Sequence, residues 1–218
     1  MRPFLFIKLK LLIFGRYYTM LEMIKGCTVP DAKKLSEQYK KEEYWIIANV
    51  NASKIEEIFQ HFISIQTERI FFILELPTNG KEEERLRKSN FDPMHKDIYY
   101  IDGLFNEQAL LLLMRYGELL INDGLCKFGF SSHDGSAEIM LEKYNIMTIW
   151  ARDTEQYRNF FDAHDIHITD NYICAWDTFS IENGGECRTI EINGISIYDL
   201  PNELKEWGIY LAETREDT

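Results

Sequence analysis

Two closely spaced histidines are the first residues whose types and spacing suggest chemistry. His164 and His167 are three positions apart. Two ligands on one helix usually bind a metal when they are four positions apart and a further ligand comes from elsewhere. His164 instead continues the apolar stripe of Tyr157, Phe160 and Phe161 in an expected helix. We therefore predict a histidine of the core or of the helix end, and no metal site.

A third histidine stands beside a carboxylate, at His133 and Asp134. With a nucleophile such as Ser132 or Ser136, this pair has the residue types of a nucleophilic catalytic site. Asp followed by Gly is also what a tight hairpin turn requires, and turn residues are rarely held rigidly enough for catalysis. A turn is the preferred interpretation. A hydrolase or transferase with a site around His133, Asp134 or His164 is the alternative function.

Familiar catalytic motifs are absent from the sequence. There is no P-loop, no glycine-rich dinucleotide loop after a strand, and no G-x-S-x-G elbow. Asp199, Glu203 and Lys205 have the residue types of a magnesium-dependent nuclease. They fall on one short expected helix, where capping and solvation explain them better. We predict no catalytic residue and no bound cofactor, and we favour a non-catalytic protein over an enzyme.

The last third of the chain interleaves aromatic and acidic side chains. Aromatic anchors within an acidic rim suit a face that binds a basic protein. Alternation on a sheet, with aromatics inward and acids outward, gives the same pattern and is the alternative. The candidate partner-binding residues are Asp170, Trp176, Asp177, Glu182, Glu186 and Glu191.

The charge of the chain points to the same kind of partner. The formal net charge is -12, and residues 131–218 alone hold 18 acidic against 6 basic residues. A surface this negative repels phosphate, so direct nucleic-acid binding is disfavoured, whereas a basic protein is attracted. The alternative is that the charge serves only solubility.

Four cysteines lie far apart, without the close pairs typical of zinc sites. Cys126 and Cys174 fall in expected strands, where a free cysteine behaves as a small apolar residue. This usage fits a reducing compartment, so we predict a cytoplasmic protein. A disulfide between Cys174 and Cys187, across an expected hairpin, is the alternative.

The elements that must position these residues begin with a strand–helix–strand unit. Residues 44–50 have the pattern of a strand. Ser53 with Glu56 three residues later is typical of a capping box that opens a helix with an apolar stripe. Residues 69–76 form the next strand. The charged run 81–96 is expected to be an exposed, mobile loop.

The second half predicts further strands and helices around a leucine-rich helix, 106–121, that is apolar on nearly every face and is expected to be central in the core. Gly124 is expected to end this helix. The other elements are a strand (97–101), a hairpin (126–130 and 137–150), a helix (153–164), a second hairpin (172–180 and 186–192), an Asn-Gly turn (193–194) and a short final helix. Together they predict an α+β fold: a mixed or largely antiparallel sheet of strand–helix–strand units and hairpins, with helices packed on it.

The chain of 218 residues is long enough to bury a substantial core. We divide it into an apolar and basic N-terminal segment (1–25), a first unit with its charged loop (26–96), a main α+β unit (97–212) and a polar tail (213–218). One continuous domain over 26–212 is the alternative. Residues 1–25 lack both the run of ~20 apolar residues that spans a membrane and a signal-peptide cleavage site. They are expected to be peripheral, or to precede a true start at Met20 or Met23.

Three stretches of the last third resemble bacterial polymorphic-toxin immunity proteins: 175–180 (AWDTFS), 185–187 (GEC) and 198–208 (YDLPNELKEWG). They cover less than a quarter of the chain. The resemblance implies a cytoplasmic, non-catalytic protein that neutralises a toxin domain by covering its active site. It also implies a basic partner, since acidic immunity proteins often face nuclease toxins and present carboxylates in place of substrate phosphates. No catalytic residue is carried over.

Overall fold

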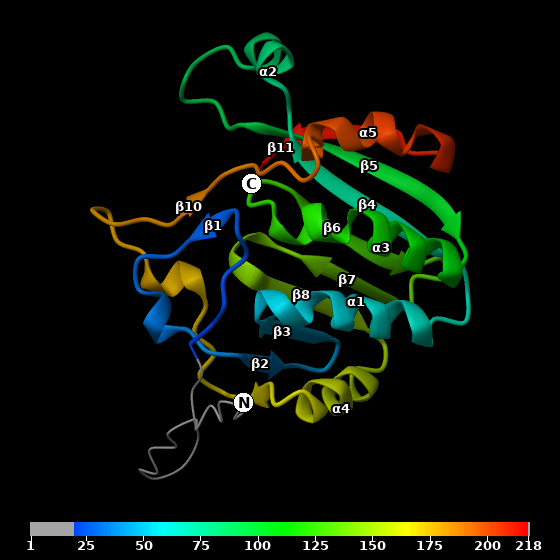
Figure 1. Ribbon diagram of the computed structural model, residues 1–218. Coiled ribbons are helices and arrows are strands. Elements are labelled where there is room, and N and C mark those ends of the chain that lie inside the picture. The colour runs from blue at the N-terminus through cyan, green and yellow to red at the C-terminus, as the bar shows by residue number, and fades with distance from the viewer. Residues whose placement is uncertain (1–19, 218) are drawn as a thin grey trace, which may run out of the picture.

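The computed structural model describes residues 20–217 and shows one large sheet with helices on one of its faces (Figure 1). The predictions for residues 1–19 and for Thr218 lie outside the described residues. The nine strands follow the order β11-β5-β4-β6-β7-β8-β3-β2-β9, and every neighbouring pair is antiparallel except β2 and β9. The predicted α+β class with a largely antiparallel sheet is confirmed.

The sheet strands are β2 (Gln38–Lys41), β3 (Trp45–Asn49), β4 (Ile70–Pro77), β5 (His95–Leu104), β6 (Lys127–Ser132), β7 (Ala137–Leu141), β8 (Ile146–Ala151), β9 (His167–Ile168) and β11 (Tyr210–Glu216). A separate two-stranded sheet pairs β1 (Cys27–Thr28) with β10 (Glu186–Cys187). The helices are α1 (Ala52–Ile65), α2 (Gly80–Leu86), α3 (Asn106–Asn122), α4 (Glu155–Ala163) and α5 (Leu200–Glu203). Short 3-10 turns are η1 (Ala32–Lys34), η2 (Lys143–Asn145), η3 (Ala175–Thr178), η4 (Ile197–Asp199) and η5 (Lys205–Trp207).

Three helices share a face because each joins two parallel strands of the same sheet. α1 joins β3 to β4, α3 joins β5 to β6, and α4 joins β8 to β9. The strands joined by α1 run opposite to those joined by α3 and α4, and α1 also crosses the sheet in the opposite direction. Connections of one hand therefore lie on one face, and the right-handed hand is strongly preferred. The opposite face is left without these helices.

The core lies between the helices and the covered face of the sheet. The apolar stripe predicted for α1 is confirmed, since Ile55, Ile58, Phe59, Phe62 and Ile63 are all buried. The Phe59 ring stacks on Phe128 of β6 with centroids 4.6 Å apart. Truncating Phe59 to alanine would remove these contacts at a cost of about 3–5 kcal/mol.

Two predicted helix ends are wrong. α1 begins at Ala52 with Asn51 as its N-cap, and the Ser53 hydroxyl donates to Glu22 instead of capping the helix. Glu56, the other residue of the predicted capping box, lies in the first turns of α1 and completes no such box. α3 ends at the C-cap Asp123, whose backbone is extended. Gly124 instead allows its backbone to lie close to that of Gly26, because a Cβ at position 124 would lie 2.2 Å from the Gly26 carbonyl oxygen.

The predicted centrality of α3 holds for one side of the helix only. Eight of its residues are buried, including Leu112 and Leu120. Met114 is 72% exposed and Leu111 is also exposed. The leucine run therefore extends onto the outer surface of the helix layer, where the side chains do not pack against the sheet.

The strand predicted over 137–150 is divided into β7 and β8 by a turn that the sequence analysis missed. Tyr144 and Asn145 both have positive φ, at 61° and 62°. The buried Asn145 amide stabilises this conformation, since its Oδ1 accepts from the Ile24 amide and its Nδ2 donates to the Glu22 and Val50 carbonyls, each at 2.9 Å. Asn145 thus connects the start of the described chain to the sheet.

The second predicted hairpin is wrong, whereas the Asn-Gly turn after it is confirmed. Residues 172–180 contain η3 and no strand, and β10 is only two residues long and pairs with β1. Asn193 and Gly194 have φ of 53° and 77°, as the preferred two-residue turn requires, and join the bridged Ile192 and Ile195.

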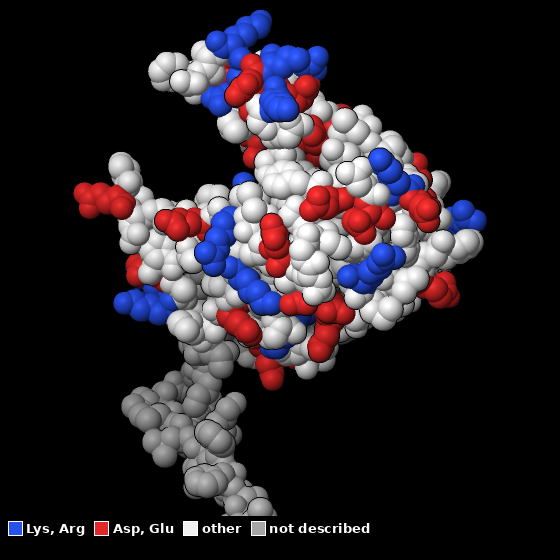
Figure 2. All heavy atoms as spheres, turned by 45° about the horizontal axis from the view of Figure 1, so that its top comes forward, with Lys and Arg blue, Asp and Glu red and all other residues white. Residues whose placement is uncertain are grey.

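The charged run 81–96 is not a simple loop. It contains most of α2 and the start of β5. α2 stands away from the main body in Figure 1, and Figure 2 shows Lys and Arg side chains gathered there beside acidic ones. The buried Glu83 of α2 accepts a hydrogen bond from the His95 amide at 3.2 Å, which attaches α2 to the start of β5. Over residues 20–217, no helix is both long and apolar enough to cross a membrane.

Candidate functional site

The face of the sheet opposite α1, α3 and α4, here called the uncovered face, carries two neighbouring hollows. Along β4, Ile70, Phe72 and Leu74 point into the core, so Phe71 and Ile73 point to the uncovered face. The same alternation in the neighbouring strands places aromatic, acidic and basic side chains side by side on this face.

A small apolar cluster separate from the main core lies on the uncovered face. It consists of Ile73 of β4, Ile98 of β5 and Met140 of β7, with Tyr100 packed against it. Gly129 of β6 is opposite both Ile73 and Met140. A Cβ at Gly129 would lie 2.4 Å from Met140 Sδ and 2.0 Å from the Ile139 carbonyl oxygen. The missing side chain therefore lets Met140 reach across β6.

The first hollow, here called the Tyr100 hollow, has a volume of about 330 Å³. This lies at the lower end of the range for ligand pockets, about 300–1,000 Å³. Tyr100 of β5 and Tyr210 of β11 stand beside each other with centroids 6.3 Å apart. The hollow is lined by Phe71, Ile73, Tyr100, Asp102, Ser131, Glu138 and Tyr210.

The two carboxylates of the Tyr100 hollow are those of Asp102 and Glu138. Asp102 accepts hydrogen bonds from the Tyr210 hydroxyl at 3.0 and 3.1 Å. Over residues 20–217, no basic side-chain nitrogen lies within 4.0 Å of Asp102 or Glu138. Within the described part of the chain, the hydrogen-bond donors to these two acids are the hydroxyls of Tyr210 and Ser131, which are neutral.

The electrostatics of the Tyr100 hollow are negative. Burial raises the pKa of Glu138, and the charges of Glu75 and Glu142 raise it further, against a hydrogen bond with Ser131 that lowers it. Burial and then the charges of Glu138 and Glu213 raise the pKa of Tyr100, against the charge of Arg215, which lowers it. Burial disfavours any charge here, whereas the charges of the neighbouring carboxylates disfavour a further negative charge and favour a cation.

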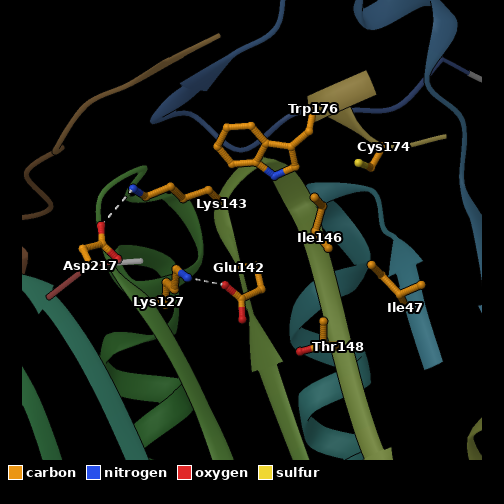
Figure 3. Close-up of a pocket in the computed structure, with 9 residues that line it drawn as sticks. All are labelled: Ile47, Lys127, Glu142, Lys143, Ile146, Thr148, Cys174, Trp176 and Asp217. Atoms are coloured by element: carbon orange, nitrogen blue, oxygen red, sulfur yellow. Dashed lines mark ion pairs between the residues drawn. The ribbon is translucent and has the colours of Figure 1, made fainter. Parts of the chain in front are cut away.

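The second hollow, here called the Trp176 hollow, has a volume of about 400 Å³. Figure 3 shows the Trp176 indole projecting over it, with Ile146 and Ile47 on the apolar side. The Tyr144 and Phe179 rings pack edge-on against Trp176, at 5.0 and 5.3 Å, and hold it in place. The lining residues are Ile47, Lys127, Glu142, Lys143, Ile146, Thr148, Cys174, Trp176 and Asp217.

The acids of the Trp176 hollow are paired with lysines. Lys127 Nζ lies 2.7 Å from Glu142, and Lys143 Nζ lies 4.0 Å from Asp217 (Figure 3). Lys96 Nζ lies 3.6 Å from Asp217 and 2.8 Å from Glu75, and so connects this group to Glu75. Burial lowers the pKa of Lys127, but the hydrogen bond and charge of Glu142 outweigh it, so the pKa lies above its usual value. The charges of this hollow are therefore already compensated.

The structure brings only one of the predicted partner-binding residues to a hollow. Trp176 is 55% exposed and lines the Trp176 hollow. Asp177 is used as a cap, since its Oδ2 accepts from the Cys174 amide at 2.8 Å. The other four are exposed on the segment 169–195, outside both hollows: Asp170, Glu182, Glu186 and Glu191.

The predicted histidines lie apart from one another. His164 follows α4 and its Nδ1 lies 2.8 Å from the Phe160 carbonyl, so the helix-end prediction is confirmed. Its Nε2 lies 3.4 Å from Glu57 in the first turns of α1. The His133 amide bonds to Arg69 beyond the other end of α1, a 14-residue helix of about 21 Å. The two histidines therefore do not share a site.

The turn around His133 has the structure that the sequence predicts. Asp134 Oδ1 accepts from the Ser136 amide at 3.0 Å, and Ser132 Oγ accepts from the amides of Ser136 and Ala137, both at 2.9 Å. Both groups are occupied in forming the turn. The His133 ring stacks on Phe71 at 5.1 Å, beside the Tyr100 hollow.

The sequence analysis missed the residues of the Tyr100 hollow. Alternation in 98–102 is a signal that Tyr100 and Asp102 share one face of their strand. Tyr210 could not be found in this way, because the C-terminal strand reaches the hollow only by pairing with β5. Over residues 20–217, His, Cys, Asp and Glu side chains form no group of three or more suited to a metal ion.

Comparisons of the chain with protein-family models, with curated proteins and with solved structures give no match.

Proposed function

We propose that this protein is a non-catalytic binding protein whose uncovered sheet face receives a basic segment of a protein partner. A lysine or arginine side chain of that partner enters the Tyr100 hollow. The observation that carries the proposal is the pair of carboxylates, Asp102 and Glu138, in an aromatic-lined hollow of about 330 Å³, with no basic side-chain nitrogen of residues 20–217 within 4.0 Å of either.

The chemistry of the hollow favours an ammonium or guanidinium group. A cation over an aromatic ring gains about 0.5–2 kcal/mol, and a hydrogen bond between charged groups gains about 1.5–3 kcal/mol. Burial also destabilises the ionised form of Glu138 in the free protein. An incoming cation removes part of this cost, and the rings of Tyr100 and Tyr210 line the same hollow as Asp102 and Glu138.

The rest of the molecule supports a protein partner over a free amine. Tyr210 on the edge strand β11 and Trp45 on β3 are large exposed apolar side chains of the same sheet, and such side chains serve as anchors in protein interfaces. The net charge of -12 accelerates encounters with a basic protein. In line with the resemblance to immunity proteins, we propose a basic toxin domain as this partner, neutralised when its active site is covered.

The first test uses side-chain mimics and needs no knowledge of the partner. The backbone amides are followed by NMR while n-butylammonium, propylguanidinium or the neutral 1-butanol is added. We expect the cations, and not butanol, to shift the amides that surround Tyr100 and Glu138, with dissociation constants on the order of 1–10 mM. Equal shifts with butanol would contradict the proposed role of charge.

A matched pair of variants links this site to the partner. D102N/E138Q removes both hollow charges, and E182Q/E186Q removes two exposed charges outside the hollows, so the net charge changes equally. We expect a stoichiometric basic protein to be retained from lysate by the wild type and by E182Q/E186Q, released by salt, and lost by D102N/E138Q. Co-expression with the retained protein then tests neutralisation. We expect growth to recover with the wild type and with E182Q/E186Q, in which the hollow is intact, and not with D102N/E138Q. Retention by all three proteins alike would sink the proposed site.

A further inference from the structure

Two cysteines far apart in the sequence face each other across the small sheet of β1 and β10. Cys27 and Cys187 are 160 positions apart and directly opposite in register. Their Sγ atoms lie 3.3 Å from each other. Cys187 therefore lies against Cys27, and the alternative disulfide with Cys174 is not the one for which the fold is arranged.

The backbone geometry suits a covalent bond between these two residues. The Arg188 amide donates to the Gly26 carbonyl at 2.8 Å, one position beyond each cysteine. Cys27 and Cys187 are thus a non-hydrogen-bonded antiparallel pair, for which Cα atoms are about 4.5 Å apart. Disulfides span Cα distances of about 4.4–6.8 Å. The bond can form with little movement of either strand.

We propose that Cys27 and Cys187 are a redox-active thiol pair that closes to a disulfide by exchange with a low-molecular-weight disulfide such as oxidised glutathione. The Cys187 thiolate attacks one sulfur of the reagent, forms a mixed disulfide and releases one thiolate. The Cys27 thiolate, its proton lost to solvent, then attacks Cys187 Sγ and displaces the second thiolate. Two protein thiols are oxidised, and one small disulfide is reduced to two thiols.

The surroundings assign the two roles. Cys187 is half-buried and open to the reagent, whereas Cys27 is 4% exposed. A hydrogen bond from the Cys27 thiol lowers the pKa of Cys187 to about 7 against the effect of burial, and Tyr144 and Lys143 lower it further, while Asp123 opposes them. Of the two thiols, Cys187 is therefore the one whose thiolate is favoured. The hydrogen bond to Cys187 and burial both raise the pKa of Cys27.

The other two cysteines lack this arrangement and serve as internal controls. Cys126 is buried with its pKa raised by burial, and its Sγ donates to the Leu120 carbonyl at 3.4 Å. Burial and a hydrogen bond with Asp177 raise the pKa of Cys174. Neither combines a lowered pKa with a facing thiol.

The pair is coupled to the Trp176 hollow through one side chain. Tyr144 hydrogen-bonds Cys187, and its ring packs edge-on against Trp176 at 5.0 Å. Closing the bond would also connect the N-terminal segment held by Asn145 to the segment that carries Trp176. This inference concerns a different place from the Tyr100 hollow and does not depend on cation binding there.

The test equilibrates the full chain with reduced and oxidised glutathione, traps free thiols with N-ethylmaleimide and identifies the products by mass spectrometry. We expect two of the four thiols to be lost, with one crosslinked peptide pair that joins Cys27 to Cys187. C126S and C174S should behave as the wild type. C27S should hold one glutathione on Cys187, and C187S should form no adduct or crosslink.

A stability measurement provides a second readout. The crosslink closes a very long loop, so the oxidised wild type should melt about 5 °C or more above the reduced form, and C174S should show the same difference. A crosslink of Cys187 to Cys174, a mixed disulfide that never resolves in the wild type, or four free thiols under oxidising conditions would each overturn the proposal.

Discussion

The Tyr100 hollow and the Trp176 hollow lie on the same face of the same sheet, yet their carboxylates have different partners. In the Trp176 hollow, Glu142 and Asp217 face Lys127 and Lys143. In the Tyr100 hollow, the residues that solvate the acids are a tyrosine and a serine. A ligand of the Trp176 hollow must displace an existing ion pair, whereas a cation in the Tyr100 hollow meets acids with no such pair.

The difference shows how a negatively charged protein can direct a basic partner to one place. Net charge accelerates encounters with the whole surface and is screened by salt. A fixed binding position requires a desolvated charge without its own counter-ion, framed by groups that exclude water. The exposed acids of segment 169–195 contribute to the first effect, and the partly buried Glu138, with the exposed Asp102 beside it in the Tyr100 hollow, supplies the second.

The largest effect is expected from filling the position between the two hollows. Gly129 lies on β6 between Lys127 of one hollow and Ser131 of the other. Gly129→Ala places a Cβ against the Ile139 carbonyl oxygen, which cannot move without distorting the ladder, so we expect unfolding to become easier by about 3 kcal/mol. Urea denaturation measures this. Gly184→Ala, with no atom within 4 Å of the new Cβ, should change little; equal costs would mean that the close approach of the Ile139 carbonyl to Gly129 is not limiting.

Removing the unpaired acids should abolish the contrast between the hollows. We expect D102N/E138Q to weaken n-butylammonium binding at least tenfold, or about 1.4 kcal/mol, because the cation loses both of its carboxylates. NMR titration against the wild type measures the change. Unaltered affinity would show that the aromatic rings alone, or another acid, hold the cation.

Removing one paired base should make the second hollow resemble the first. Lys127→Met leaves Glu142 without its nearest base beside Trp176, and we expect a loss of about 1 kcal/mol in the free energy of unfolding. The variant should also gain butylammonium-dependent shifts of the Trp176 indole signal. Lys40→Met, which breaks the exposed pair with Glu42, is the control and should show neither effect. If Lys127→Met binds no cation, pairing is not what separates the two hollows.

The smallest expected effect is a pH dependence of stability at Glu138. Its folded pKa is raised above the usual value of about 4.3. Between these two values the unfolded chain has already lost the proton that the folded protein keeps, so stability falls as pH rises, and above the folded pKa the loss stays constant. Relative to the wild type, Glu138→Gln should therefore gain about 0.5 kcal/mol between pH 4 and pH 7, a small figure because Glu138 is partly exposed. Urea titrations at several pH values would contradict this if the wild type gained instead, since that would require a basic partner for Glu138.

Local patterns in the sequence were sufficient for much of the secondary structure. The stripe of α1, the helix that ends at His164 and the turn at Asn193 follow from spacing and residue type alone. These features depend on neighbours within a few positions, and so does the choice of an α+β fold. The turn at Tyr144 and Asn145 could not be predicted from local patterns, because its positive φ angles are stabilised by backbone groups of residues 22–24 and 50.

The candidate sites were decided by tertiary structure. Alternation shows which side chains share a face of a strand, but it does not show which strand is the neighbour or in what register. Tyr210 reaches Asp102, 108 positions away, only because β11 pairs with β5, and Cys187 meets Cys27 only because β10 pairs with β1. The sequence by itself determined an acidic chain with amphipathic elements. Long-range pairing decided which acids lack a counter-ion and which thiols face each other, because both depend on packing between segments that no local pattern connects.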